Sequence, residues 1–112
     1  MTTLTTDVHT EAGDVLLHLA GELDSTTAPL FRAVFLQAVA SRPRHIEVDM
    51  RSLTFCDSAG LQALLATRDA AAAAGVGFHL AHVQGALQRV LSVTGLDAAF
   101  SVLTREDPVG RN

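Results

Sequence analysis

Cysteine and the larger aromatic residues are nearly missing from this chain of 112 residues. It has one cysteine, Cys56, and five phenylalanines, but no tryptophan or tyrosine. A single cysteine excludes an internal disulfide, and no Cys/His spacing typical of a zinc site is present. With so few aromatic side chains, we expect a core built largely from leucine, valine and alanine.

Positive charge and long apolar runs are also scarce. The net charge of -4 and a pI near 5.6 argue against a protein that grips nucleic-acid phosphates. No apolar stretch approaches the roughly 20 residues that span a bilayer, and the N-terminus lacks the pattern of a signal peptide. The sequence therefore predicts a cytoplasmic globular protein with no direct nucleic-acid contact and no membrane insertion.

Length and hydrophobic periodicity predict one domain over residues 1–112, with a core from about 4 to 103 and a polar tail at 104–112. The first two strands should pair antiparallel around a turn, and the later strand-helix-strand unit should form a parallel right-handed crossover. We therefore expect an α/β fold in which helices pack against a mixed sheet of four to five strands. Strands are predicted at 4–10, 15–20, 45–50, 76–82 and 99–103. Helices are predicted at 28–40 and 58–74, and a third helix includes residues 87–91 and ends at Gly95. A loop is predicted at 51–56.

A short polar motif, FCDSAGL at residues 55–61, begins the second predicted helix. Ser58 lies where the chain leaves the carboxyl end of a sheet, the edge at which functional groups gather in open α/β folds. The helix N-terminus tolerates an attached phosphate. Gly60 could let a partner approach Ser58 closely, and Asp57 could accept a proton or help bind a nucleotide's metal. The same residues also fit a plain helix cap, because Asp and Ser both favour the N-cap.

A nucleophilic serine is not predicted, because the chain has no G-x-S-x-G elbow. His18, His79 and His82 fall within predicted strands, where we expect packed or surface side chains rather than a catalytic base. No acidic or thiol cluster joins them, so neither a metal site nor another cofactor is expected. Cys56 is predicted to be a small buried hydrophobic residue, with redox sensing as the alternative.

Three blocks in order carry a family resemblance: LAGELD at 19–24, FCDSAGL at 55–61 and LSVTGL at 91–96. On these blocks the chain resembles the STAS domain family, and within it the single-domain anti-sigma factor antagonists of bacteria, from about Val15 to Leu103. Two positions depart from the family pattern. Ala59 stands where many relatives carry Ser or Thr, which leaves Ser58 as the sole hydroxyl there, and Cys56 stands where a larger apolar residue is common.

The resemblance implies a regulatory protein that itself catalyses nothing. An anti-sigma factor that is an ATP-dependent serine kinase would phosphorylate Ser58, and a serine phosphatase would remove the phosphate. The unphosphorylated chain would bind the anti-sigma factor and release the sigma factor. For the loop at 21–24, a turn with a capping aspartate is a compatible alternative to partner contact. The residues expected at the partner surface are Asp24, Ser25, Thr26, Asp57, Ser58, Ala59, Gly60 and Leu61.

Two other functions stay open on the sequence. STAS domains also serve as accessory subunits of membrane transport complexes, such as lipid-transport ATPases, and there Ser58 would only shape a contact surface. A small hydrolase is the third hypothesis, which the missing Ser-His-Asp arrangement disfavours.

Overall fold

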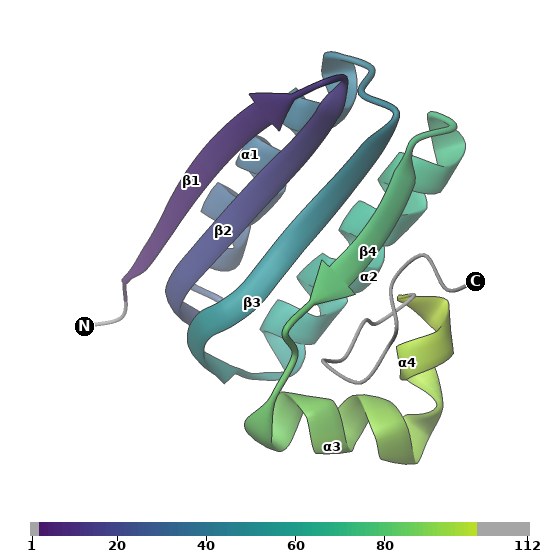
Figure 1. Ribbon diagram of the computed structural model, residues 1–112. Coiled ribbons are helices and arrows are strands. Elements are labelled where there is room, and N and C mark those ends of the chain that lie inside the picture. The colour runs from purple at the N-terminus through teal and green to yellow at the C-terminus, as the bar shows by residue number, and fades with distance from the viewer. Residues whose placement is uncertain (1–2, 101–112) are drawn as a thin grey trace.

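A four-stranded mixed sheet organises residues 3–100, the part of the chain that the computed structural model describes (Figure 1). The strands lie in the order β1-β2-β3-β4, with β1 antiparallel to β2 and β3 parallel to both β2 and β4. The predicted α/β class and mixed sheet are confirmed. The elements along the chain are β1 (Leu4–Glu11), β2 (Asp14–Leu23), α1 (Ala28–Ala40), β3 (His45–Cys56), α2 (Ser58–Ala73), β4 (Gly77–Ala81), α3 (Gly85–Thr94) and α4 (Leu96–Ala99).

The core lies between the sheet and two helices on one of its faces. Helices α1 and α2 run behind the sheet, whereas none of the described helices covers the opposite face (Figure 1). Phe31 and Phe35 of α1 and Leu64 of α2 are fully buried. They pack with the alternating apolar side chains of the central strands, as expected for a sheet with one buried face. These strand residues are Val15, Leu17, Leu19, Ile46, Val48 and Met50.

The hairpin between β1 and β2 turns on two residues, Ala12 and Gly13. Their φ angles are 54° and 86°, so both adopt the left-handed region. A two-residue turn with two positive φ angles has the twist that joins antiparallel strands without splaying them. The predicted antiparallel pairing around a turn at 11–14 is therefore confirmed.

Strand β3 is twice as long as predicted, because the expected loop at 51–56 continues the strand to Cys56. This second half pairs with the end of β2, where Gly21 lies opposite Leu53 and Leu23 opposite Cys56. The register shifts twice along this stretch, between His18 and Ala20 and again between Gly21 and Glu22. Such irregularities interrupt the alternation of buried and exposed side chains, which is the signal by which a strand is recognised in a sequence.

The predicted last strand at 99–103 is wrong at its first two residues, because Ala99 ends the short helix α4 and Phe100 caps it in a turn. Phe100 follows the helix and is fully buried, and its carbonyl oxygen accepts a hydrogen bond from the Leu80 N–H at 3.4 Å. Its ring meets Phe78 edge to face. Burial of an apolar residue such as Phe100 therefore does not by itself indicate a strand, because a helical turn buries it equally well. Residues 101–103 lie outside the described part of the chain.

Candidate functional site

The first two sequence blocks meet at the carboxyl edge of the sheet. Leu23 and Cys56 are register partners at the ends of β2 and β3. Just beyond them, the Asp57 N–H donates a hydrogen bond to the Leu23 carbonyl oxygen at 3.3 Å. The loop that leads into α1 and the first turn of α2 therefore lie side by side, as expected where adjacent parallel strands end.

Asp57, rather than Ser58, caps helix α2. The Asp57 carboxylate accepts a hydrogen bond from the Gly60 N–H at 3.0 Å, which satisfies one of the unpaired donors of the first turn. Ser58 is the first residue of the helix and is exposed. Its hydroxyl makes no side-chain hydrogen bond with any other residue in the range 3–100. The helix-cap interpretation is correct for Asp57 and leaves Ser58 available to a partner.

Replacing Asp57 with alanine is expected to lower the free energy of unfolding by about 0.5–2 kcal/mol, because the cap of a 16-residue helix is lost. Asp57→Asn, which keeps an acceptor oxygen, should lose much less. Urea denaturation followed by circular dichroism measures both values. Equal stability of Asp57→Ala and the wild type would show that this cap contributes nothing.

Gly60 packs inside the domain. The prediction that it lets a partner approach Ser58 is therefore wrong. Gly60 is buried, and a Cβ atom at this position would lie 2.5 Å from the Leu23 carbonyl oxygen and 2.8 Å from the Cys56 sulfur. Only glycine lets α2 approach the ends of β2 and β3 this closely. Gly60 thus brings the helix against the sheet and does not present an open backbone to a partner.

Cys56 packs against the core, as predicted for a small hydrophobic residue, but it is only partly buried. The side chain is half-buried beside Gly60, and burial, with a smaller contribution from the Asp57 charge, raises the pKa of its thiol to about 11. Because the thiolate is the reactive form, a thiol with this pKa is almost fully protonated and unreactive at neutral pH. The geometry therefore disfavours redox sensing at Cys56.

The loop between β2 and α1 is built around Asp24, which is buried. Its carboxylate accepts hydrogen bonds from the Thr26 and Thr27 N–H groups at 2.9 and 3.1 Å. The Thr27 hydroxyl accepts from the Asp24 N–H at 3.0 Å and donates to the Glu22 carbonyl at 2.7 Å. Asp24 thus holds the turn that precedes α1, as the turn interpretation predicts, whereas the residue at the N-cap of the helix is Thr27. Ser25 and Thr26 are exposed.

Phe55 is a surface residue that sequence reasoning missed. It directly precedes the Cys56-Asp57-Ser58 stretch, yet half of its side chain (50%) is exposed. It lines a groove of about 540 Å³ between the end of β3 and the start of α3, together with Leu53 and Leu87. Because 51–56 was predicted to be a loop, no alternation suggested that this apolar side chain would face outward. The feature of the sequence that could have indicated an exposed Phe55 is its position two residues before the polar pair Asp57 and Ser58.

The third block, at 91–96, shapes the end of α3. Leu91 is buried in the core, and Gly95 adopts the left-handed conformation, with φ of 78°, that terminates the helix. Within residues 3–100, no helix is long and apolar enough to cross a membrane. Over the same range, no group of three or more His, Cys, Asp or Glu side chains could hold a metal ion.

The mixed four-stranded sheet, with helices on one face and a serine at the start of the second helix, is a STAS-type α/β fold. The chain belongs to the STAS domain family: the family described as "Mlab, STAS domain" matches residues 6–104. A STAS-domain containing protein from Pseudomonas aeruginosa (strain UCBPP-PA14) is 27% identical over 89 residues, which cover 80% of this chain and 87% of the relative.

Two solved structures show the same fold. An anti-sigma factor antagonist from Mycobacterium paratuberculosis is 29% identical, with a TM-score of 0.78 over 89% of this chain and 85% of that one. The anti-sigma factor antagonist SpoIIAA of Bacillus, in its unphosphorylated form, is 20% identical, with a TM-score of 0.75 over 92% of this chain and 90% of that one. The second likeness concerns the fold alone.

Proposed function

We propose that this protein is an anti-sigma factor antagonist that is switched off by phosphorylation of Ser58. The unphosphorylated chain binds an anti-sigma factor serine kinase in its ATP-bound form and releases the sigma factor, in the cytoplasm. The observation that carries the proposal is the exposed Ser58 hydroxyl at the first turn of α2, which makes no side-chain hydrogen bond within residues 3–100 because Asp57 provides the cap. The likeness to the Mycobacterium paratuberculosis antagonist supports it.

Electrostatics explains how one phosphate can act as a switch here. At the N-terminus of a 16-residue helix, a phosphate meets unpaired N–H groups and the positive end of the helix dipole, so the folded domain tolerates it. The same group adds roughly -1.5 to -2 charges to the surface around Ser58. A partner that buries this surface must desolvate that charge, which disfavours docking.

The proposed partner surface consists of two kinds of residues. Exposed side chains make contact, and these are Ser25, Thr26, Phe55 and Ser58. Buried or half-buried residues hold the two loops in place, and these are Asp24, Asp57, Ala59, Gly60 and Leu61. A serine phosphatase that restores the active form must also reach phospho-Ser58, which the exposure of this position allows.

Phosphorylation in vitro with the partner anti-sigma factor kinase and Mg·ATP, followed by intact-mass spectrometry, tests the switch. We expect the wild type to gain one phosphate, which ends its binding to the kinase, and Ser58→Ala to gain none. Ser92→Ala is the matched control, because Ser92 is an exposed serine on α3, outside the proposed partner surface. It should still gain one phosphate. A wild type that is never modified, or a Ser58→Ala variant that is, contradicts the proposal.

A second candidate function is an accessory subunit of a membrane lipid-transport complex without a phosphorylation switch. The observation that favours it is the description of the matched family, which prints "Mlab" rather than an anti-sigma factor antagonist. Co-purification separates the two proposals. A stable complex with a membrane ATPase subunit that survives Ser58→Ala supports the accessory subunit, and capture of a soluble serine kinase supports the antagonist.

A further inference from the structure

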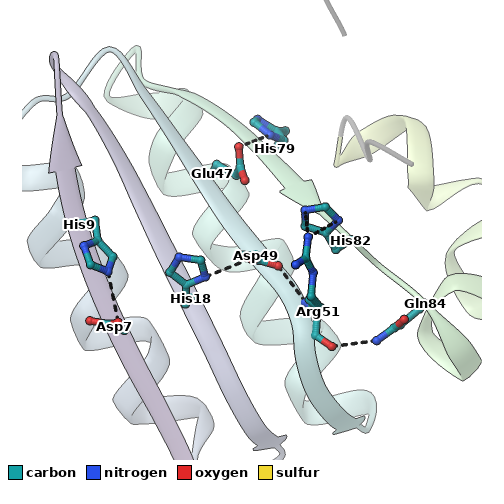
Figure 2. Close-up of polar contacts among 9 residues, drawn as sticks. All are labelled: Asp7, His9, His18, Glu47, Asp49, Arg51, His79, His82 and Gln84. Atoms are coloured by element: carbon teal, nitrogen blue, oxygen red, sulfur yellow. Dashed lines mark hydrogen bonds and ion pairs between the residues drawn. The ribbon is translucent and has the colours of Figure 1, made fainter. Parts of the chain in front are cut away.

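Histidines gather on the sheet face that none of the described helices covers. His9, His18 and His79 stand on three different strands of this face, with His82 just beyond β4 (Figure 2). His9 pairs with Asp7 at 3.2 Å and His18 with Asp49 at 3.0 Å. Each of these two contacts joins an imidazole to a carboxylate. The two contacts that join β4 to β3 are of a different kind.

The first of these contacts is a hydrogen-bonded chain from Glu47 through His79 to His45. His79 Nε2 lies 3.1 Å from the Glu47 carboxylate, which can only accept, so this nitrogen carries the proton. In a neutral ring, Nδ1 of His79 is then an acceptor and takes a hydrogen bond from Nε2 of His45. The two rings lie 4.5 Å apart between centroids. When both imidazoles are protonated, both facing nitrogens are donors and the contact becomes a repulsion.

The second contact joins Arg51 of β3 to His82. The guanidinium Nη2 of Arg51 lies 2.9 Å from Nε2 of His82 (Figure 2). Guanidinium can only donate, so His82 must be neutral to accept, and protonation sets two cations side by side. His82 also has a φ of 60°, in the left-handed region that is unfavourable for its side chain. Beside it, the Gln84 side chain donates to the Arg51 carbonyl oxygen at 2.8 Å.

The charged groups around these contacts decide the direction of the pH effect. Burial and, after it, the neighbouring His45 hold the pKa of His79 below its ordinary value of 6.5, and together they outweigh Glu47, which favours the protonated form. On β2, Asp14 is the register partner of His45. Asp49 accepts from the Arg51 N–H at 2.9 Å and is paired with His18. On the other face of β4, Arg68 and Asp69 of α2 lie near Phe78 and pair with each other.

A depressed histidine pKa means that the unfolded or locally opened chain binds more protons than the closed one. The stability that this contact contributes is therefore present above about pH 6.5 and is lost as the pH falls below that value. We expect the loss to be local, because the hydrogen bonds of the His45, His79 and His82 side chains join β3 to β4 and to the segment just after β4, and none of these hydrogen bonds involves the β1–β2 hairpin.

We propose that the His45–His79 and Arg51–His82 contacts form an acid-sensitive latch that releases β4 and the start of α3 from β3. The Arg51–His82 contact borders a groove at the carboxyl end of β3, lined by residues 50, 51 and 53–56 on one side and by residues 84–87 on the other. The His45–His79 contact lies at the opposite end of β3, where it joins the first half of β4. Phe55 lies in that groove, next to the Ser58 site. Acidification thereby loosens the groove wall formed by α3 while the β1–β2 hairpin stays closed. This inference does not depend on the identity of the partner.

Hydrogen exchange of the full chain at pH 7.5 and 5.5, with rates corrected for the intrinsic effect of pH, tests the latch. We expect protection of residues 77–87 to be lower at pH 5.5 than at pH 7.5, while residues 4–23 keep their protection. His79→Gln keeps a hydrogen-bonding side chain that cannot be protonated, so it should lose much of this response. His9→Gln is the matched control, because it removes a histidine from the same face without touching β4.

Two results would overturn the latch. One is equal protection of residues 77–87 at both pH values in the wild type. The other is a wild-type response in His79→Gln. If His79→Gln does not fold, Glu47→Gln decides the question: without the carboxylate, His79 protonates less readily, and the loosening should move to lower pH. If Glu47→Gln loses protection of residues 77–87 at the same pH as the wild type, or at a higher pH, the proposal is wrong.

Discussion

Replacing Gly60 with alanine is expected to lower the free energy of unfolding by about 1–3 kcal/mol, although alanine is the better helix former. The added Cβ would lie 2.5 Å from the Leu23 carbonyl oxygen, closer than any non-bonded contact tolerates. That oxygen belongs to the backbone and also accepts the Asp57 N–H, so it cannot move aside without breaking the link between β2 and α2. The first turn of α2 must shift instead.

Chemical denaturation of Gly60→Ala beside Gln62→Ala measures this effect. Gln62 is exposed on the same helix, so its replacement should change stability by no more than about 0.5 kcal/mol. The shift of α2 should also displace Ser58, and NMR chemical shifts of residues 23–27 and 56–61 report such a movement. If Gly60→Ala and Gln62→Ala are equally stable, the close contact of α2 with the sheet at Gly60 does not contribute to stability.

Replacing Phe55 with alanine is expected to weaken binding to the anti-sigma factor by about 2 kcal/mol or more, which is roughly 30-fold in Kd. This expectation rests on the proposed antagonist function. An aromatic side chain that is 50% exposed beside the Ser58 site offers a large apolar area that the free domain leaves in water. A partner that covers this side chain gains the free energy of burying its apolar surface, and Phe55→Ala removes that gain.

Isothermal titration with the anti-sigma factor measures the loss, and thermal unfolding shows whether the domain itself is intact. Val8→Ala is the matched control, because Val8 is 47% exposed but lies on β1, at the edge of the sheet away from β3. We expect Val8→Ala to bind as the wild type does. If Phe55→Ala binds with wild-type affinity, Phe55 does not belong to the partner surface. Phosphorylation of Ser58 is tested separately by mass spectrometry.

Local patterns predicted the class of fold and the place of the candidate site. Ile46, Val48 and Met50 alternate because one face of their strand is buried, and such alternation is visible in any sequence of a half-buried strand. The start of α2 was equally readable, since Asp57 at the N-cap and Ser58 after it follow from the chemistry of unpaired helix N–H groups. Both features depend on neighbours within a few residues.

The role of Gly60 could not be read from the same stretch. In the sequence it is a small residue beside a serine, which suggested access for a partner. In the structure, Gly60 is where α2 packs against the backbone of Leu23, a residue far earlier in the chain. The second half of β3 was missed for a related reason: its pairing with β2 passes through two register shifts, which no local periodicity reveals.

The sequence by itself determined the α/β order of elements, the buried faces of the strands and helices, and the position of a serine at the start of α2. The structure decided that Asp57 provides the cap and that Ser58 is exposed. Only the tertiary structure decided that Leu23 and Cys56 end side by side, that Phe55 faces a groove, and that His45 meets His79. The physical reason is that helix caps and amphipathic faces are local properties of the chain. Contacts between strands depend on register and on loop closure over tens of residues, so they exist only once the sheet has formed.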